Sequence, residues 1–379
     1  MCDFMTQWGR QISKLFFSSG ASKDMNAPGM DALMSPESGE ESQSCLACLV
    51  KERPPFMKAS FSVGDLTLSP PLALAPMVGL SHSALRSLVL ELGGVGLLFT
   101  EMLSVNRLPQ ENADVSPFLL RYPEEQPLFY QLFVSPGQDV VPAVERLHQL
   151  GAQGVDLNLG CPAPNLRKQG AGCALTNDRE QVRRTVAMLR AATHLPLSAK
   201  IRLGTTLHEE ELVDFCRMLE GEGVDLLSVH GRLHKEKFCR RPRWDWIGKV
   251  KSAVTIPVLA NGGIFSVDDA RKCLELSGAD GLMLGRGAVC RPWLFAEIAR
   301  EIYGVSCPPT SLSLADIYFR FVDLLGRFRQ ERRLGRLKQF SHYYGQNFTF
   351  GHHLAIAVQT SSSVEQALER AHQFFSRNQ

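Results

Sequence analysis

The sequence contains no apolar run near the ~18 residues that a membrane-spanning helix needs, and it has no signal-peptide core. We therefore expect no membrane partner and a cytoplasmic location. An excess of one charge is also missing, since 41 Lys and Arg residues stand against 39 Asp and Glu residues, a net charge of +2. This balance excludes a polybasic chain that binds nucleic acid over its whole surface.

Cysteines with metal-ligand spacing are absent as well. The ten cysteines are scattered, and Cys45 and Cys48 form a Cys-x-x-Cys without a second pair. We therefore expect no zinc site. Because disulfides are rare in the cytosol, this cysteine usage predicts reduced thiols.

Regular hydrophobic periodicity is scarce over the first 56 residues. Residues 18–44 are rich in Ser, Gly, Met and polar side chains, and we predict that 1–69 form a largely disordered N-terminal extension. A weak amphipathic helix over 4–17 leaves a mitochondrial targeting role open. A start site placed too far upstream is a further alternative.

Short apolar runs rich in β-branched residues recur from residue 72 onward, with helical patterns between them. This alternation indicates βα units and a parallel sheet. Eight units fit a (β/α)8 TIM barrel, which typically takes roughly 250 residues. We predict an α/β protein with a TIM barrel over 70–305 and a small all-helical domain over 306–379. The predicted strands lie near 72–76, 96–101, 128–133, 153–158, 197–201, 224–229, 257–260 and 280–284.

Polar and glycine-rich residues gather at the C-terminal ends of these predicted strands, where the active site of such a barrel lies. A chance arrangement would scatter them over both rims. The residues at these ends are Ala75-Pro76-Met77, Thr100-Glu101-Met102, Gln131, Asn158 with Cys161, Lys200 with Arg202, His230-Gly231-Arg232, Asn261-Gly262-Gly263 and Gly285-Arg286-Gly287.

The segment Asn158-Leu159-Gly160-Cys161-Pro162 is the most informative of these ends. Gly160 permits a sharp turn and Pro162 fixes φ beyond it, so the turn holds a thiol at the mouth of the strand. Such a thiol can be a nucleophile or a proton donor, because its environment sets its pKa. Asn158 offers a donor and an acceptor, which suits a planar amide-like ring. A buried structural cysteine in a tight turn is the alternative.

The last two strand ends indicate an anion site. Asn261-Gly262-Gly263 and Gly285-Arg286-Gly287 are short glycine turns that lead into helical stretches. Their backbone N–H groups can approach an anion closely, and Arg286 can add a charge-assisted hydrogen bond. Because the loops after strands 7 and 8 commonly bind phosphate in such barrels, we predict a phosphate-bearing cofactor. Ordinary tight connections are the alternative.

Three further strand-end residues fit a cofactor with a polar ring edge. Lys200 points to the same side of its strand as Arg202, and a lysine inside a barrel mouth is costly unless it is paired. A reduced flavin would supply the negative charge. Gln131 can hydrogen-bond a pyrimidine-like edge. The position of His230 at the mouth favours a functional role over the structural role that a lone histidine usually has.

Together these motifs resemble the tRNA-dihydrouridine synthase family of the bacterial type, over roughly residues 70–345. One departure is Leu233, where the family usually has a small hydroxyl residue. The matching segments are Asp156-Leu157-Asn158-Leu159-Gly160-Cys161-Pro162, Lys168-Gln169-Gly170-Ala171-Gly172, Ala75-Pro76-Met77, Lys200-Ile201-Arg202, His230-Gly231-Arg232, Asn261-Gly262-Gly263-Ile264 and Gly285-Arg286-Gly287.

The resemblance implies an enzyme that holds FMN in the barrel and uses NADPH to reduce one uridine of tRNA to 5,6-dihydrouridine. It implies Cys161 as the general acid for C5, while hydride passes from the reduced flavin to C6. Asn158 and Arg202 would bind the target base, which must be flipped out of the stack. The implied cofactor-binding residues are Ala75, Pro76, Met77, Gln131, Lys200, His230, Asn261, Gly262, Gly263, Gly285 and Arg286.

Two basic segments are candidate RNA contacts. The loop after His230 contains a single acid, Glu236. Helical spacing over 314–325 predicts a helix, and we expect Arg329, Arg332 or Arg333, and Arg336 to share one helix face near Phe340, Tyr343 and Tyr344. Solvated surface residues and core aromatics are the alternative. The predicted RNA-binding residues are Arg232, Lys235, Lys237, Arg240, Arg241, Arg329, Arg333, Arg336 and Lys338.

Three functions remain open from the sequence. The first is a flavin-dependent tRNA uridine reductase. The second is an FMN barrel oxidoreductase acting on a small pyrimidine, as a dihydroorotate dehydrogenase does, and the basic C-terminal helix argues against it. The third is a tRNA-binding protein with a decayed redox site, and the intact Cys161, Lys200 and His230 argue against it. The sequence does not indicate which uridine is modified or whether NADPH is preferred to NADH, and a monomer is sufficient.

Overall fold

The structure, a computed structural model, describes residues 58–377. The helix expected over 4–17 and the pair Cys45 and Cys48 lie outside the described residues. Eight strands overlap the eight ranges expected from the sequence. They are β3 (Leu72–Leu74), β4 (Leu98–Phe99), β6 (Leu128–Phe133), β7 (Gly154–Asn158), β8 (Leu197–Arg202), β9 (Leu226–His230), β10 (Val258–Asn261) and β11 (Gly281–Leu284).

These strands close into a barrel. Their order is β3-β11-β10-β9-β8-β7-β6-β4, and the neighbours along it pair in parallel. The ring closes between β3 and β4, where Ala73 forms a parallel bridge with Leu97 and the N–H of Leu74 donates to the carbonyl of Leu97 at 2.9 Å. The expected TIM barrel is confirmed, and the C-terminal rim is its functional end.

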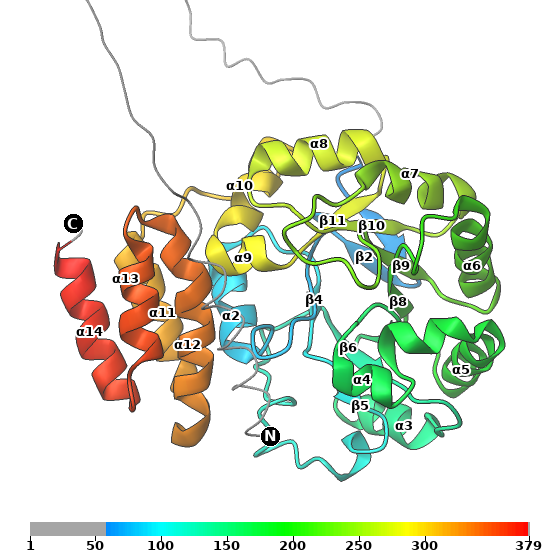
Figure 1. The fold of residues 1–379 in the computed structure, drawn as a ribbon, viewed down its shortest axis with the longest axis horizontal. Coiled ribbons are helices and arrows are strands. Elements are labelled where there is room, and N and C mark those ends of the chain that lie inside the picture. The colour runs from blue at the N-terminus through cyan, green and yellow to red at the C-terminus, as the bar shows by residue number, and fades with distance from the viewer. Residues whose placement is uncertain (1–57, 378–379) are drawn as a thin grey trace, which may run out of the picture. The chain divides into compact units, whose positions relative to one another are not determined.

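Helices cover the outside of the barrel, and Figure 1 shows α3, α5, α6, α7 and α8 around the strands. One connection departs from the expected alternation: between β4 and β6 the chain forms the short strand β5 (Leu103–Ser104) and the 3-10 helix η1 (Leu108–Gln110) in place of an α-helix. The barrel helices are α2 (Ser83–Leu92), α3 (Val141–Gln149), α4 (Pro164–Lys168), α5 (Arg179–Ala192), α6 (Glu209–Gly221), α7 (Trp244–Ala253), α8 (Val267–Ser277), α9 (Arg286–Cys290) and α10 (Leu294–Glu301).

Residues 61–68, shortly before the first barrel strand, are folded, in contrast to the disorder expected over 1–69. Strands β1 (Phe61–Val63) and β2 (Leu66–Leu68) form an antiparallel hairpin. Phe61, Val63 and Leu68 are buried in one cluster with interior side chains of the barrel. The expectation is therefore wrong for residues 61–68, because two three-residue strands carry too little periodicity to stand out in a sequence.

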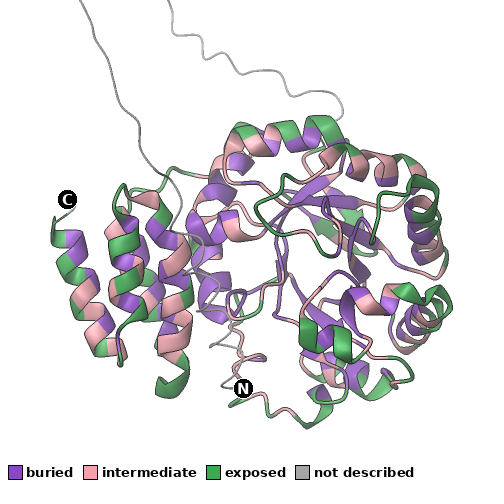
Figure 2. Cartoon of the chain, viewed as in Figure 1, coloured by how far each residue is buried: buried purple, intermediate pink, exposed green. Residues whose placement is uncertain are grey.

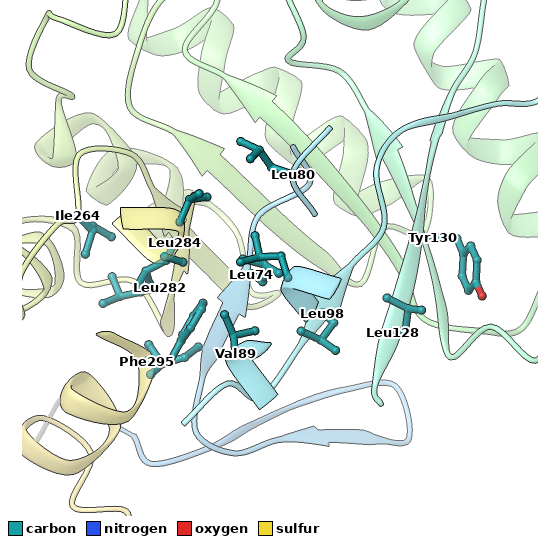
Figure 3. Close-up of a cluster of buried hydrophobic side chains, with 14 of the residues drawn as sticks. Leu74, Leu80, Val89, Leu98, Leu128, Tyr130, Ile264, Leu282, Leu284 and Phe295 are labelled. Carbon is teal, nitrogen blue, oxygen red and sulfur yellow. The ribbon is translucent and has the colours of Figure 1, made fainter. Parts of the chain in front are cut away.

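Side chains alternate between the inside and the outside of the barrel along each strand. On β6, Phe129 belongs to the interior cluster, while Leu128 and Tyr130 belong to the outer core beneath the helices. Figure 3 shows part of this outer core, with Leu74 and Leu98 among the labelled residues. In Figure 2 the strands are buried and the barrel helices expose their outer faces. The inward parity of β6 continues to Gln131, which therefore faces the barrel mouth.

Four helices follow the barrel, as the predicted fold class requires: α11 (Leu314–Leu325), α12 (Arg333–Tyr344), α13 (Gly351–Gln359) and α14 (Val364–Arg377). The start of α11 is fixed by a capping box between Ser313 and Asp316. The helix predicted over 314–325 is confirmed. Figure 1 shows these helices packed together, and α11 contacts α2 of the barrel. Within residues 58–377, the short 3-10 helices are η1, η2 (Gly172–Asn177), η3 (Gln330–Arg332) and η4 (Gly345–Asn347).

The single basic helix face expected near residue 330 is wrong. Helix α11 ends at Leu325, and Arg329 lies in the connection before α12. The aromatic residues near it are mostly core. Phe340 and Tyr344 are 0% exposed, and the ring of Phe340 stacks on that of Phe321 with centroids 3.7 Å apart. The core interpretation is therefore right for Phe340 and Tyr344, which cannot stack on RNA bases.

Candidate active site

The mouth of the barrel is lined by a chain of buried amide, carboxyl and hydroxyl groups. The amide Nε2 of Gln131 donates to Oδ2 of Asp156 at 2.6 Å, and Ser198 Oγ donates to Oδ1 of Asp156 at 2.6 Å. Asn158 Nδ2 donates in turn to Oε1 of Gln131 at 2.8 Å. Burial raises the pKa of Asp156 to about 6, and the hydrogen bonds from Ser198 and Gln131 oppose that shift. This chain fixes the orientation of both amide side chains.

Asn158 also shapes the loop that carries the thiol. Its Oδ1 accepts the backbone N–H of Cys161 at 3.0 Å and that of Gly160 at 3.3 Å. The second loop contact is the N–H of Cys173, which donates to the carbonyl of Cys161 at 3.1 Å. Burial raises the pKa of the Cys161 thiol, while Arg202 and Lys200 oppose this shift. The raised pKa keeps this thiol protonated at neutral pH, and Cys161 is only half-buried.

Lys200 is an enclosed ammonium group. Its Nζ donates to Oδ1 of Asn261 at 3.1 Å, and Asn261 is oriented by its own donation to the carbonyl of Met283 at 2.7 Å. Burial, and after it the neighbouring Arg202, lowers the pKa of Lys200 to about 8 against the opposing effect of Asp156. A single neutral partner leaves most of this charge uncompensated.

His230 ends β9 next to this group. Its Nε2 lies 2.9 Å from Nη1 of Arg232. Because a guanidinium has no acceptor, Nε2 must accept and the ring proton must lie on Nδ1. Burial and the cations Lys200, Arg202 and Arg232 hold the pKa of His230 well below its usual range. Gly262, with φ +110°, passes so close that a Cβ there would be 2.5 Å from the His230 ring. The position of the His230 ring therefore requires a glycine at residue 262.

The loop after β9 folds back over the mouth. Arg232 is 3% exposed, and its guanidinium donates to the carbonyls of Arg240 at 2.8 Å and Phe238 at 3.1 Å. Glu236 closes the other side of the loop through two hydrogen bonds of 2.7 Å from Arg243. The loop is thus tied to its own first residue, which fixes where its exposed side chains lie.

Three guanidinium groups surround the ring of Phe238 at this end of the barrel, and Lys200 lies near the histidine stacked on it. The guanidiniums of Arg286, Arg202 and Arg232 lie 4.4, 5.8 and 6.0 Å from the ring centroid of Phe238, and Lys200 lowers the pKa of the stacked His230. Within residues 58–377, none of these four cations forms an ion pair with a carboxylate. The acids nearest to these cations are Glu236, which is paired with Arg243, and Asp156, so much of the positive charge remains, and this suits an anionic ligand.

The remaining strand-end residues line the same mouth. Ala75 is buried after β3, and Pro76 and Met77 are half-buried beside it. A Cβ on Gly285 would lie 3.5 Å from the sulfur of Met77, so the turn after β11 faces this loop. Gly263 has φ +74° and packs on Pro242 at the base of the loop after β9. The structure thus brings together all of the predicted catalytic, substrate-binding and cofactor-binding residues.

The model of a family described as dihydrouridine synthase matches residues 73–372. The chain belongs to the dihydrouridine synthase family. It is 36% identical over 246 residues to probable tRNA-dihydrouridine synthase 1 of Synechocystis sp., which is 65% of this chain and 69% of that protein. It is 31% identical over 325 residues to a probable tRNA-dihydrouridine synthase of Mycobacterium tuberculosis, covering 81% and 84%. Among solved structures, a complex of 2-naphthoyl-CoA reductase has a TM-score of 0.48 at 14% identity, over 70% of this chain and 55% of that one.

For this member of the dihydrouridine synthase family, the predicted RNA contacts fall into two sets. Lys235, Lys237, Arg240, Arg241 and Arg329 are exposed. Arg232 and Arg336 are not: Arg232 is buried beside His230, and the side chain of Arg336 is only 11% exposed. For these two arginines we expected surface positions from the sequence, but both side chains are largely buried. Charge alone does not indicate which arginines have internal acceptors.

Two other predicted contacts have structural partners in the helical part. Arg333 donates to the carbonyl of Phe328 at 2.6 Å and to that of Gly326 at 2.7 Å, which closes the connection between α11 and α12. Lys338 is half-buried, and its carbonyl accepts a hydrogen bond from Gln359 at 2.9 Å. The backbone of Lys338 thus holds α13, while its ammonium group forms no ion pair among the described residues.

Sequence reasoning missed two residues of this candidate site. Asp156 anchors both Gln131 and Ser198, and its position two residues before Asn158 on one strand indicates that it shares the inward face. Phe238, 51% exposed among arginines, has no such periodic signal because it lies in a loop. Among the described residues, no helix is long and apolar enough to cross a membrane, and no group of three acidic, His or Cys side chains is placed to hold a metal.

Proposed function

We propose that this protein reduces a uridine of tRNA to 5,6-dihydrouridine, with FMN bound in the barrel mouth and NADPH as the reductant. The family match over residues 73–372 supports the reaction class. The observation that carries the proposal is the protonated thiol of the half-buried Cys161 beside the fixed amides of Asn158 and Gln131. An acid next to an amide pair is what reduction of a pyrimidine ring requires.

The residues present fit FMN. Its phosphate would be bound by the uncompensated guanidinium of Arg286 and by the backbone of the turns at Gly262 and Gly285. A Cβ at Gly262 would collide with the ring of His230. Lys200 and Gln131 would hold the polar edge of its ring system. When bound and reduced, FMN supplies the hydride that C6 of uracil accepts.

The chain itself supplies the proton. Burial keeps the Cys161 thiol protonated near neutral pH, so Sγ can deliver a proton to C5 of the base. The hydrogen bonds from the N–H groups of Gly160 and Cys161 to Asn158 hold the loop, and therefore Sγ, in one place. A proton donor that is held in one place is already oriented for the reaction, which lowers the entropic part of the barrier.

Asn158 has a donor to spare for the base. One hydrogen of Nδ2 goes to Gln131, and the other faces only the sulfur of Met102 at 3.7 Å, a weak acceptor. A uracil carbonyl is a stronger acceptor and would displace that contact. Arg202, buried with one nitrogen on the carbonyl of Leu233 at 2.9 Å, can add a second bond to the base.

The test uses the purified protein and its absorption spectrum. We expect a flavin spectrum that NADPH bleaches without oxygen, and that unmodified tRNA restores while free uridine and orotate do not. Recovery with a small pyrimidine in place of tRNA would assign the protein to the small-molecule oxidoreductases. A protein that binds tRNA but no flavin would contradict the proposed reaction altogether.

A further inference from the structure

Glu101 follows β4 at the barrel mouth, and none of the roles above uses it. It is 3% exposed. Its Oε2 accepts the backbone N–H of Gly79 in the loop after β3, while its Oε1 has no hydrogen-bond partner among the described residues. Burial raises the pKa of this carboxyl, and the Gly79 N–H and Arg336 oppose the shift. A buried carboxylate with one free oxygen needs a positive partner.

That partner comes from the helical domain. Arg336 of α12 places Nη2 4.0 Å from Oε1 of Glu101, with side chains 11% and 3% exposed. Its guanidinium lies 4.5 Å from the ring centroid of Phe328, and its Nη1 donates to the carbonyl of Arg332 at 3.0 Å. Its Nε has no partner within residues 58–377. Arg336 is thus held by its own domain on one side and directed at the barrel on the other.

A second side chain of α12 reaches the same loop. Gln339 lies three residues after Arg336, so both side chains share one helix face. A Cβ placed on Gly79 would overlap the amide of Gln339, which shows how closely the two residues pack. Gly79 also has φ +74°, a conformation that favours glycine. One residue of the loop therefore contacts Glu101 of the barrel and Gln339 of the helical domain.

The contact between Glu101 and Arg336 lies next to proposed site residues at the ends of both β3 and β4. Directly after Glu101, the sulfur of Met102 accepts from Asn158 Nδ2 at 3.7 Å. In the loop after β3, the backbone N–H of Met77 is fixed by Ser81 Oγ at 2.8 Å. Glu101 therefore lies one residue from a contact of Asn158, and the loop that it anchors continues into the segment held by Ser81.

We propose that Glu101 and Arg336 are positioning residues whose ion pair fixes the helical domain, and the RNA bound on it, relative to the catalytic mouth. This inference rests on the proposed function, because only a large RNA bound by both the barrel and the helical domain would be affected by their relative position. Arg336 acts through Glu101 and not through an RNA phosphate. Neither side chain touches the base or the cofactor, so the pair governs delivery of the RNA rather than the chemistry.

The test compares Arg336→Gln, Glu101→Gln and the double variant as full-length, flavin-loaded proteins. We expect each single change to lower kcat/KM for tRNA roughly tenfold, and the double variant to be no worse than either single one, because all remove the same interaction. Reduction of the flavin by NADPH should stay unchanged, and Arg336→Lys should recover part of the loss. Additive losses in the double variant, or slower flavin reduction, would overturn the proposal.

Arg320→Gln is the matched control. Arg320 of α11 pairs with Glu91 of α2 through two bonds of 2.8 Å, so it also joins the helical domain to the barrel, but on the exposed surface. Exposed pairs contribute little, and we expect kcat/KM to stay within about twofold. A loss equal to that of Arg336→Gln would mean that any attachment between the parts matters, which contradicts a specific role for Glu101.

Salt dependence separates the pair from a phosphate contact. Removing one lysine or arginine that neutralises an RNA phosphate lowers the slope of log K against log salt by about 0.7 to 0.9. An internal ion pair contributes no such term, so tRNA binding by Arg336→Gln should keep the slope of the unchanged protein. A slope lowered by nearly one would return Arg336 to the RNA surface and overturn the inference.

Amide hydrogen exchange tests the pair even if tRNA is not the substrate. Failure of tRNA to reoxidise the unchanged protein would contradict the proposed function alone. In that case Arg336→Gln should still speed exchange over residues 77–81 at least several-fold relative to Arg320→Gln, because the loop loses the partner of its anchor. Equal exchange in the two variants would contradict the positioning role itself.

Discussion

The ammonium group of Lys200 on β8 is hydrogen-bonded to Asn261 on β10, across the intervening strand β9. This 3.1 Å contact joins the half of the site that carries Cys161 to the half that carries the glycine turns. It also leaves the lysine charge without a carboxylate at hydrogen-bonding distance among the described residues. The first prediction follows from that charge.

Affinity of the cofactor-free protein for FMN should fall as pH rises through about 8, the pKa to which burial, and then Arg202, lowers Lys200. Above this pH the lysine is neutral and no longer attracts an anion, so affinity should drop by up to about tenfold per pH unit. The lowered pKa has the opposite effect on folding: between about pH 8 and 10.5 the unfolded chain binds a proton that the native protein does not, so the free energy of unfolding rises with pH.

Fluorescence titration of FMN between pH 6.5 and 9.5 measures this dependence. Lys200→Gln is the control, since it keeps a hydrogen-bond donor but has no charge to lose. It should bind FMN more weakly and with a flatter pH profile. Parallel profiles for the two proteins would show that another group controls the affinity.

Cys161→Ala should bind flavin and tRNA normally and slow uracil reduction by about 10² to 10⁴-fold, the usual contribution of a positioned acid. Rapid-mixing measurements separate the two half-reactions: bleaching of the flavin by NADPH should be unchanged, and its recovery with tRNA should be slow. Cys173→Ala is the matched control. Cys173 is a buried cysteine, and its backbone N–H donates to the carbonyl of Cys161 in the same loop. Normal recovery in Cys161→Ala would remove that residue from the mechanism.

The exposed cations of the loop after β9 should contact RNA phosphates. Lys235→Gln with Arg241→Gln should weaken tRNA binding and lower the salt slope by about 0.7 to 0.9 for each phosphate that is no longer neutralised. Filter binding over a range of salt concentrations gives the slope. Lys272→Gln, a change to a cation on α8, should leave the slope unchanged. If both changes had the same effect, binding would depend on net charge and not on this loop.

Leu68→Ala should lower the free energy of unfolding by about 2 to 5 kcal/mol, because Leu68 is 1% exposed within the barrel interior. Urea unfolding measures this loss, and flavin binding by the folded variant should stay unaltered. Thr67→Ala, on the exposed side of the same strand, should change the free energy of unfolding by under about 0.5 kcal/mol. Equal effects would place the hairpin outside the core.

The barrel could be predicted because strand ends repeat one simple relationship. Short apolar runs that recur along the chain with helical patterns between them indicate the strands, and the polar residue after each run lies at the C-terminal rim. Asn158, Lys200, His230 and Asn261 were found this way, and the structure places all four together. Their grouping needed only the parity of a strand and the order of the chain.

Whether an individual arginine is buried or exposed could not be predicted in this way. Arg232 and Arg336 have the same sequence signature as Arg241, yet the first two are enclosed and the last is exposed. The difference lies in distant acceptors, such as the carbonyl of Arg240 or the carboxylate of Glu101, which only tertiary packing brings near. The hairpin at 61–68 was missed for a related reason, since its burial depends on the barrel that it closes.

The guanidinium groups around Phe238 affect the stability of the folded protein. Like charges held this close repel one another, and Glu236 offsets only part of the repulsion because it is paired with Arg243. Binding of an anion would relieve the repulsion that remains. A ligand at one hundred times its dissociation constant would add about 2.7 kcal/mol to the free energy of unfolding. The fraction of folded protein would then depend on the concentration of the phosphate-bearing ligand. When that ligand is scarce, the first effect would be a lower melting temperature.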